Sequence, residues 1–193
     1  MKRYLLVALV AGLFGLAAAL VVNGPGPIWR TELGQRALHA TMQKAPDGVL
    51  IAKRGEPLPA IALQTLDGTR LTLPLPEGRP ALINVWATWC PPCVKEMPML
   101  AEFARAEGDS GVQVIGVALD DADAIHAWLQ RLPSPYPHYR DDPGKHDAGV
   151  VLGNPAGVMP YTVLVAADGR VLKQRIGPFD SVDDIAKWSD TRH

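Results

Sequence analysis

A mostly apolar run at Ala81–Trp86 is the feature that most constrains the fold of this chain. Its length and apolar content are typical of a strand that is buried on both faces. Apolar residues then recur at helical spacing from Met97 to Ala104, which predicts a helix directly after the strand. A second buried strand is predicted at Val112–Leu119. The sequence therefore predicts a βαβ crossover, whose two strands are normally parallel.

Two hairpins complete the predicted sheet. In each of them an Asp-Gly pair separates two strand-like runs, and glycine adopts the positive φ of a tight turn at low cost. The paired runs are Ala60–Gln64 with Arg70–Leu73, around Asp67-Gly68, and Tyr161–Ala166 with Arg170–Ile176, around Asp168-Gly169. A second helix is predicted after an N-cap at Asp120 or Asp121, and a last helix after Asp180 or Ser181. These elements predict an α/β fold with a mixed central sheet and helices on both faces.

The composition excludes several classes of protein. Hydrophobic residues make up 48% and charged residues 20% of the chain, so it can bury a core. The formal net charge of -1 gives no electrostatic reason to bind nucleic acid, and aromatic residues at 6% argue against a base-stacking surface. The presence of only two cysteines excludes a multi-disulfide scaffold and a zinc site of four thiolates.

The N-terminus carries an export pattern. Lys2 and Arg3 precede an apolar run, Leu5–Val22, that would span roughly 27 Å as a helix, close to the ~30 Å hydrocarbon core of a membrane. The basic residues predict that the N-terminus stays in the cytoplasm and that the rest of the chain faces the periplasm or exterior. A signal peptide cleaved after the alanines at 17–19, which leaves a soluble periplasmic protein, is an alternative, and a buried core helix is another.

Three segments are expected along the chain. Residues 1–23 form a transmembrane anchor or signal, and residues 24–54 form a linker or stalk that includes a helical stretch between residues 28 and 44. Residues 55–193 form the folded domain, because hairpin, strand and helix patterns follow one another from there.

Both cysteines lie in the segment Trp89-Cys90-Pro91-Pro92-Cys93, between the predicted strand and the predicted helix. The N-terminus of a helix carries partial positive charge and free N–H groups, which stabilise a thiolate at Cys90. A thiolate is the species that attacks a disulfide, and Cys93 is then placed to attack the mixed disulfide formed at Cys90. This placement predicts a redox-active pair in an exported protein.

Two other interpretations of the cysteine pair stay open. A structural disulfide that closes so short a loop would stabilise the fold by only about 2 kcal/mol, because it removes little entropy from the unfolded chain. A metal site would need ligands from the histidines, none of which has the usual paired spacing to the cysteines. We interpret all 5 histidines as solvated or locally bonded, and we expect neither a metal nor a cofactor.

Residues 85–98, VWATWCPPCVKEMP, resemble the active-site segment of the TlpA/ResA/DsbE branch of the thioredoxin-like superfamily, and the resemblance extends over about residues 55–188. It implies a thioredoxin-like fold with an N-terminal β-hairpin extension and an N-terminal transmembrane helix. It also implies a thiol-disulfide oxidoreductase of the inner membrane that faces the periplasm and uses a Cys90–Cys93 disulfide. Members commonly reduce protein disulfides, including those of apocytochrome c during cytochrome c maturation. The resemblance further implies an electron donor in the membrane of the CcdA/DsbD kind.

The candidate substrate-binding residues surround the cysteines. In this family the proline matching Pro160 is cis and faces the disulfide, whereas the residues alone predict an ordinary trans bond between Met159 and Pro160 at a strand start. Alternation along the strand predicts that Trp89 is exposed. With Pro91 and Pro92, Trp89 is expected to offer an apolar surface to a partner protein.

Glu96 follows Cys93 on the predicted helix and has two interpretations. The resemblance implies a proton acceptor or a modulator of the thiol pKa. An acidic residue near the start of a helix would equally suit the helix dipole. Asn84 lies within the buried strand, where it cannot ionise and is expected to play a structural role through its hydrogen bonds. Trp86 is expected to pack in the core by alternation.

Two other functions are alternatives to disulfide reduction. A thiol peroxidase would need a threonine three residues before the reactive cysteine, where this chain has Ala87, and Thr88 lies one residue too close. A copper-binding or copper-delivery module is a further alternative, although related copper proteins use a longer cysteine spacing and a distal histidine. We predict reduction of protein disulfides, with oxidation as the alternative direction.

Overall fold

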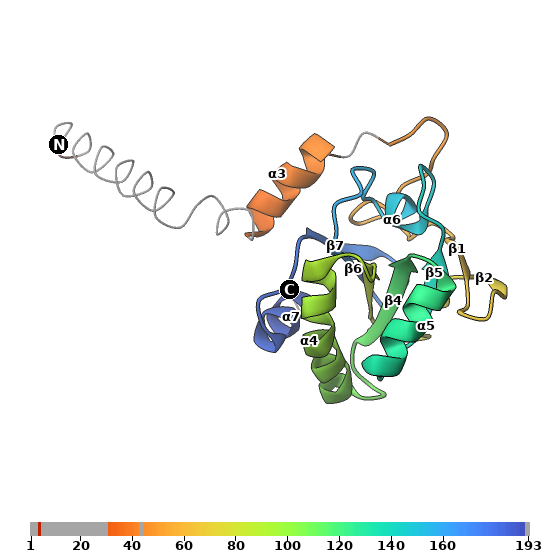
Figure 1. Ribbon diagram of the computed structural model, residues 1–193. Helices are drawn as coiled ribbons and strands as arrows, with labels where there is room; N and C mark the ends of the chain where they lie inside the picture. The colour runs from red at the N-terminus through yellow and green to blue at the C-terminus, as the bar shows by residue number, and fades with distance from the viewer. Residues whose placement is uncertain (1–3, 5–30, 43–44, 192–193) are drawn as a thin grey trace. The chain divides into compact units, whose positions relative to one another are not determined.

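The computed structural model describes residues 4, 31–42 and 45–191 (Figure 1). The chain divides into two compact units, residues 1–41 and 42–193. A helix, α3 (Glu32–Met42), lies within the stretch that was predicted to be partly helical. The apolar run Leu5–Val22 falls outside the described residues. In the described part of the chain, no helix combines the length and the apolar content that crossing a membrane requires.

The second unit is built on a mixed sheet. Among the described residues the sheet has 7 strands in the order β2-β1-β5-β4-β3-β6-β7. The strands are β1 (Ala62–Gln64), β2 (Arg70–Thr72), β3 (Ala81–Trp86), β4 (Gln113–Leu119), β5 (His138–Asp141), β6 (Tyr161–Val165) and β7 (Val171–Ile176). The central strand β3 runs parallel to β4 and antiparallel to β6, and both predicted hairpins form antiparallel pairs. The predicted crossover and the predicted mixed sheet are therefore confirmed.

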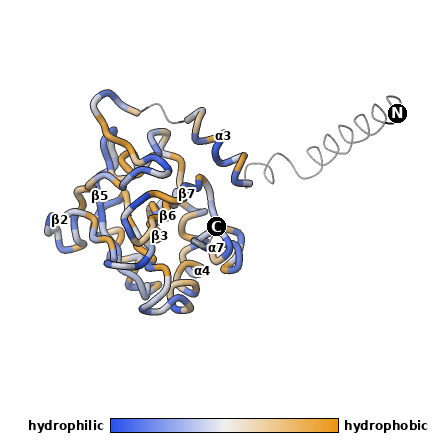
Figure 2. Tube along the Cα trace, turned by 180° about the vertical axis from the view of Figure 1, so that it is seen from behind, coloured by the Kyte–Doolittle hydropathy of each residue, from blue (hydrophilic) through white to orange (hydrophobic). Residues whose placement is uncertain are grey.

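In the described part of the second unit, four helices accompany the sheet. They are α4 (Pro91–Glu107), α5 (Ala122–Arg131), α6 (Ala148–Val151) and α7 (Val182–Ser189). Successive residues of β3 point to opposite faces of the sheet. Leu82 packs in one core cluster with Leu100 of α4 and Ile185 of α7, whereas Ile83 packs in another with Ala148 of α6. The helices thus cover both faces, and Figure 2 shows hydrophobic residues along the central strands β3 and β6.

For two helices the sequence left two candidate N-cap residues, and the structure identifies one of them in each case. Ser181 precedes α7 and its Oγ accepts a hydrogen bond from the backbone N of Asp184 at 3.1 Å. Asp121 precedes α5 without a capping bond from its side chain. The sheet core also includes Ile51 and Ala52, which are 5% and 0% exposed, so the packed unit takes in chain that precedes Gly55.

The sequence did not predict β5 and α6. Strand β5 consists of the residues HYRD, which lack the apolar alternation of a recognisable strand. It forms because its backbone pairs with β4 in parallel and with β1 in antiparallel fashion. Helix α6 is only 4 residues long, too short for a periodic pattern to be visible.

Candidate active site

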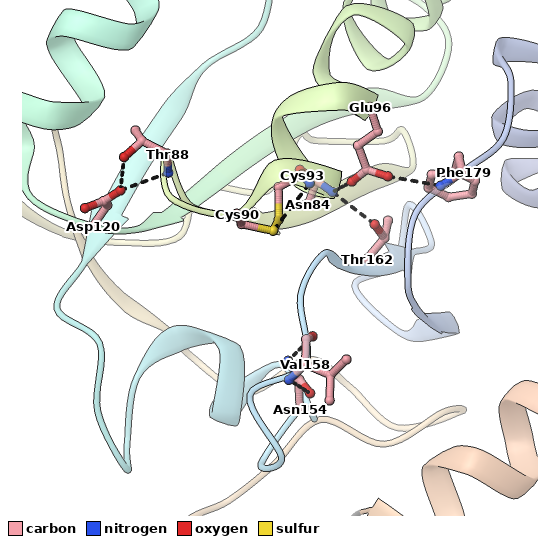
Figure 3. Close-up of a disulfide and its surroundings, with 10 residues drawn as sticks. All are labelled: Asn84, Thr88, Cys90, Cys93, Glu96, Asp120, Asn154, Val158, Thr162 and Phe179. Carbon is pink, nitrogen blue, oxygen red and sulfur yellow. Dashed lines mark hydrogen bonds between the residues drawn. A yellow bond between two sulfur atoms is a disulfide. The ribbon is translucent and has the colours of Figure 1, made fainter.

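The junction between β3 and α4 places both cysteines at the start of the helix (Figure 3). Cys90 is the N-cap residue in an extended conformation, and Pro91 and Pro92 occupy the first two helical positions. Because neither proline has an N–H group, the first free amide of the helix is that of Cys93. This amide donates to Cys90 Sγ at 3.3 Å. The helix start therefore directs its positive end at the sulfur of Cys90.

The two cysteines form a disulfide, with an S–S distance of 2.03 Å and a Cα–Cα distance of 5.3 Å. Cys90 is 5% exposed and Cys93 is 0% exposed, so the sulfur of Cys90 is the more accessible to a partner. Both belong to a buried cluster that includes Trp86. A thiolate formed at Cys90 would therefore be the more exposed of the two sulfurs, with Cys93 fully buried beside it.

Trp86 is buried and Trp89 is exposed, as the alternation of side chains along the strand predicted. Trp86 is 0% exposed and its ring lies 5.4 Å from that of Trp128 in α5. Trp89 is 62% exposed, and Pro91 and Pro92 beside it are also exposed. The surface around Cys90 is thus apolar and open.

The peptide bond between Met159 and Pro160 is cis, as the family resemblance implied. Met159 packs against the buried cluster that holds both cysteines. The preceding loop is held by Asn154, which is 3% exposed; its Nδ2 donates to Val158 O at 2.9 Å and its Oδ1 accepts from Val158 N at 3.2 Å. The segment before β6 thus lies beside the disulfide. The spacing of these residues along the chain does not reveal this proximity.

Glu96 is 0% exposed and lies on the same face of α4 as Cys93. Its Oε1 accepts from Asn84 Nδ2 at 2.7 Å and its Oε2 accepts from the backbone N of Phe179 at 3.0 Å (Figure 3). Burial raises the pKa of Glu96 to about 7, against the opposing effects of these hydrogen bonds and of the Arg175 charge. The carboxylate is therefore held by β3 and by the segment before α7, and it titrates near neutral pH beside the cysteines.

Asn84 is buried and hydrogen-bonded through its amide nitrogen, as the sequence predicted, whereas its Oδ1 has no hydrogen-bond partner among the described residues. It is 1% exposed, and its amide nitrogen also donates to Thr162 Oγ1 of β6 at 3.2 Å. Because its partners lie on α4 and β6, this neutral side chain ties the active-site helix to the neighbouring strand. It also donates to the carboxylate of Glu96 without adding a charge.

A second anchor of the active-site loop was missed from the sequence. Asp120, at the end of β4, accepts hydrogen bonds at Oδ2 from the backbone N of Thr88 at 2.9 Å and from Thr88 Oγ1 at 2.5 Å. Thr88 stands two residues before Cys90, so this pair fixes the approach to the helix. The only signal in the sequence is an aspartate at a strand end, which equally predicts an N-cap for the next helix.

The interpretation of every histidine as solvated or locally bonded is wrong for His138. Its ring lies 5.4 Å from that of Trp86 and 4.7 Å from that of Tyr136, and among the described residues neither ring nitrogen has a hydrogen-bond partner. Burial lowers the pKa of His138 to about 4, so the imidazole is neutral at pH 7. The ring fits here because Gly116 of β4 lacks a side chain; a Cβ there would lie 2.3 Å from His138 Nδ1.

The described residues also bear on metal binding. Within residues 4, 31–42 and 45–191, no group of three or more histidine, cysteine, aspartate or glutamate side chains is placed to hold a metal ion. The cysteine sulfurs are joined to one another. The active site places a disulfide, a helix N-terminus and a buried carboxyl group together, and thiol-disulfide exchange uses groups of these kinds.

Comparisons with known proteins agree with this chemistry. Residues 53–188 match the Redoxin family. The chain is 33% identical over 194 aligned residues to the thiol:disulfide interchange protein DsbE of Pseudomonas fluorescens biotype C, an alignment that covers 96% of this chain and 93% of that protein. It is 30% identical over 125 residues to the thiol-disulfide oxidoreductase ResA of Bacillus thuringiensis (strain Al Hakam), which covers 64% of this chain and 69% of that protein.

A solved structure supports the same assignment. The thioredoxin-related protein from Neisseria meningitidis serogroup B matches with a TM-score of 0.57 and 30% sequence identity, covering 65% of this chain and 93% of that chain. The match supports a thioredoxin-like fold for the sheet and its helices. The chain therefore belongs to the redoxin family, in its TlpA/ResA/DsbE branch, and is a thiol-disulfide oxidoreductase.

Proposed function

We propose that the chain reduces disulfide bonds of exported proteins through Cys90 and Cys93. The observation that carries this proposal is the position of Cys90 at the N-cap of α4 with Cys93 buried behind it. In the reduced protein, the Cys90 thiolate attacks one sulfur of a substrate disulfide and releases the other as a thiolate. The Cys93 thiolate then attacks Cys90 Sγ and releases the second substrate sulfur. Two electrons pass to the substrate, and the protein is left with the disulfide seen here.

In this reaction Glu96 would accept the proton that Cys93 must lose. The two side chains share one face of α4 at spacing i, i+3, and both are 0% exposed. Since burial brings the pKa of Glu96 to about 7, its carboxylate and carboxylic acid forms coexist at neutral pH. A group in that state can take up and return a proton within one catalytic cycle.

Glu96→Gln is expected to remove a pH dependence of stability. Burial raises the pKa of Glu96 from 4.5 to about 7, so between these values the folded protein keeps a proton that the unfolded chain has lost. The contribution is therefore fully present below about pH 4.5 and is lost as the pH rises through 7, a change of about 3 kcal/mol in the free energy of unfolding. Denaturant unfolding of the full-length chain at about pH 4.5 and pH 8 measures it.

Glu102→Gln is the matched control, because Glu102 is an exposed glutamate on the same helix. The control should keep the wild-type fall in stability between the two pH values, and the Glu96 variant should lose most of it. A Glu96→Gln protein whose stability falls as much as that of the wild type would show that this carboxyl group does not titrate near neutrality.

The substrate would dock on the exposed apolar surface beside Cys90. Trp89, Pro91 and Pro92 form this surface, and Met159 and Pro160 bring the start of β6 to its edge. Apocytochrome c is the substrate that the TlpA/ResA/DsbE branch suggests. A membrane thiol transporter of the CcdA/DsbD kind would return electrons to the Cys90–Cys93 pair after each cycle.

A redox titration of the Cys90–Cys93 couple tests the direction of the reaction. Equilibration of the full-length chain with glutathione or dithiothreitol buffers, followed by alkylation of free thiols, gives the reduction potential. A potential near about -270 mV or below fits a reductase, whereas one near about -120 mV would make the protein an oxidant and overturn the proposed direction.

We further propose that Leu5–Val22 anchors the protein in the inner membrane with the catalytic domain in the periplasm. Lys2 and Arg3 before the run and the absence of charge within it support this orientation. Retention of the chain in membranes after carbonate extraction would support the anchor. Release of a shortened chain would instead indicate the cleaved signal.

A further inference from the structure

An ion pair between a buried arginine and a partly exposed aspartate lies beside the Glu96 network and has no part in the reaction proposed above. Arg175 of β7 is 3% exposed, and its Nη2 donates to Asp184 Oδ2 of α7 at 2.9 Å. The same nitrogen donates to Pro178 O at 3.0 Å, and the guanidinium carbon lies 4.3 Å from the centroid of the Phe179 ring. Arg175 is thus fixed by a carboxylate, a carbonyl and an aromatic face.

These contacts hold the backbone amide that Glu96 uses. Asp184 Oδ2 also accepts from the backbone N of Asp180 at 3.2 Å. Together with the bond from Arg175 to Pro178 O, the ion pair is therefore hydrogen-bonded to the backbone on both sides of Phe179. The backbone N of Phe179 donates to Glu96 Oε2 at 3.0 Å. A hydrogen bond to the ionised form of a carboxyl group favours that form. The ion pair therefore positions a donor that stabilises the Glu96 carboxylate.

The two residues of the pair have opposite effects on Glu96, because Arg175 acts on it directly and Asp184 acts only through Arg175. The positive charge of Arg175 lowers the pKa of Glu96 and so opposes the larger effect of burial. Asp184 is negative and is bound to the same guanidinium, so it offsets part of the Arg175 field. The Arg175 side chain is only 4% exposed, so salt and water screen its charge weakly, whereas the Asp184 side chain is 32% exposed and its charge is screened more strongly.

The other groups around Glu96 contribute little charge. Asn84 of β3 and Thr162 of β6 are neutral, and burial raises the pKa of Tyr136, whose hydroxyl stays protonated. On its own helix, Cys93 is held in the disulfide in this state. Among the described residues, Arg175 is the charged side chain that acts on the Glu96 carboxyl group.

We propose that Arg175 and Asp184 together set the acidity of Glu96. Arg175 is a positioning residue that favours the carboxylate, both by its charge and by holding the Phe179 amide, and Asp184 limits that effect. The inference rests on the proposed function, because it is there that Glu96 accepts the proton of Cys93. The pair would thereby determine the pH range in which the resolving cysteine can be deprotonated.

A direct titration of the Glu96 carboxyl group tests the proposal. The full-length oxidised chain is labelled with ¹³C-glutamate, and the carboxyl resonance that is absent in Glu96→Gln is followed from about pH 4 to pH 9. Arg175→Met should raise the midpoint by about one pH unit, at the low end of what a nearby opposite charge produces. Arg175→Lys should stay closer to wild type because it keeps the charge. Asp184→Asn should lower the midpoint, because the asparagine oxygen can still accept from the backbone N of Asp180 while the Arg175 charge is left uncompensated.

The midpoint is expected to rise in Arg175→Met and to fall in Asp184→Asn. These opposite shifts distinguish the proposed role from a merely structural one, since disruption of the fold would not move the two midpoints in opposite directions. Asp183→Asn is the control, because Asp183 is the adjacent residue of α7 and pairs with Lys187 on the surface. Midpoints that move in the same direction, or by no more than in the control, would overturn the proposal. If Arg175→Met does not fold, a midpoint in Asp184→Asn that rises or stays unchanged is sufficient to overturn it.

The titration reads Glu96 itself, so it is independent of turnover. Opposite shifts together with unchanged turnover in Glu96→Gln would refute the proton-acceptor role and still support the tuning by Arg175 and Asp184. Unshifted midpoints together with a loss of turnover in Glu96→Gln would support the proton-acceptor role of Glu96 and refute the tuning by Arg175 and Asp184.

Discussion

Cys90→Ser is expected to abolish disulfide reduction, with a loss of at least about a thousandfold in kcat/KM, as is usual when an enzyme loses its nucleophile. A serine hydroxyl stays protonated at neutral pH, so the helix N-terminus has no thiolate to stabilise. Cys93 cannot replace it, because Cys93 is 0% exposed and a protein substrate cannot reach its sulfur. The loss is measured as the rate at which the full-length chain, itself reduced beforehand, reduces the disulfides of insulin.

Cys93→Ser is the informative companion variant. It keeps the attacking sulfur and loses the resolving one, so it should form a mixed disulfide with the substrate and stop there. Mass spectrometry under non-reducing conditions detects this covalent complex, which Cys90→Ser should fail to form. Turnover that survives Cys90→Ser would refute the assignment of Cys90 as the nucleophile.

Trp86→Ala is expected to destabilise the folded protein by about 3–5 kcal/mol, the usual cost of truncating a large buried aromatic side chain. Trp86 is 0% exposed and packs in the cluster that contains both cysteines and Ile125. Its removal leaves a cavity beneath the disulfide that the surrounding side chains can fill only in part. Denaturant unfolding of the oxidised full-length chain measures the free energy of unfolding.

Trp89→Ala is the matched control, since it removes the same side chain three residues further along from a site that is 62% exposed. We expect a change in stability within about 0.5 kcal/mol, as for most surface substitutions. Its effect should instead be a raised KM for a protein substrate with little change in the reaction of the reduced protein with a small disulfide. Equal destabilisation by the two substitutions would contradict the assignment of Trp86 to the core and of Trp89 to the docking surface.

The parts of the fold that could be predicted are those with strong local patterns. The β3–α4–β4 crossover was visible because Ala81–Trp86 is mostly apolar and helical spacing follows it. The two hairpins were visible because an Asp-Gly pair marks each turn, and Gly68 indeed has φ 89°. Strand β5 was not visible, because its polar residues are held in the sheet by the backbone of β4 and β1.

The same distinction between local patterns and long-range contacts applies to the candidate site. The cysteine pair at the start of a helix follows from consecutive residues, whereas the partners of Glu96 are 12 and 83 residues away along the chain. Two of the charges and donors that bear on Glu96, Arg175 and the Phe179 amide, come from the last strand and the segment that follows it. No local pattern connects these residues to the cysteines.

The amino-acid sequence by itself thus determined the chemistry of this protein, because the reactivity of a thiol at a helix N-terminus depends on neighbours within one helical turn. The tertiary structure alone decided the environment that surrounds that chemistry. It buried Glu96 among Asn84 and Phe179, and it left His138 neutral between two aromatic rings. Burial and hydrogen bonding between distant segments govern these proton affinities, and both arise only when the sheet and its helices pack together.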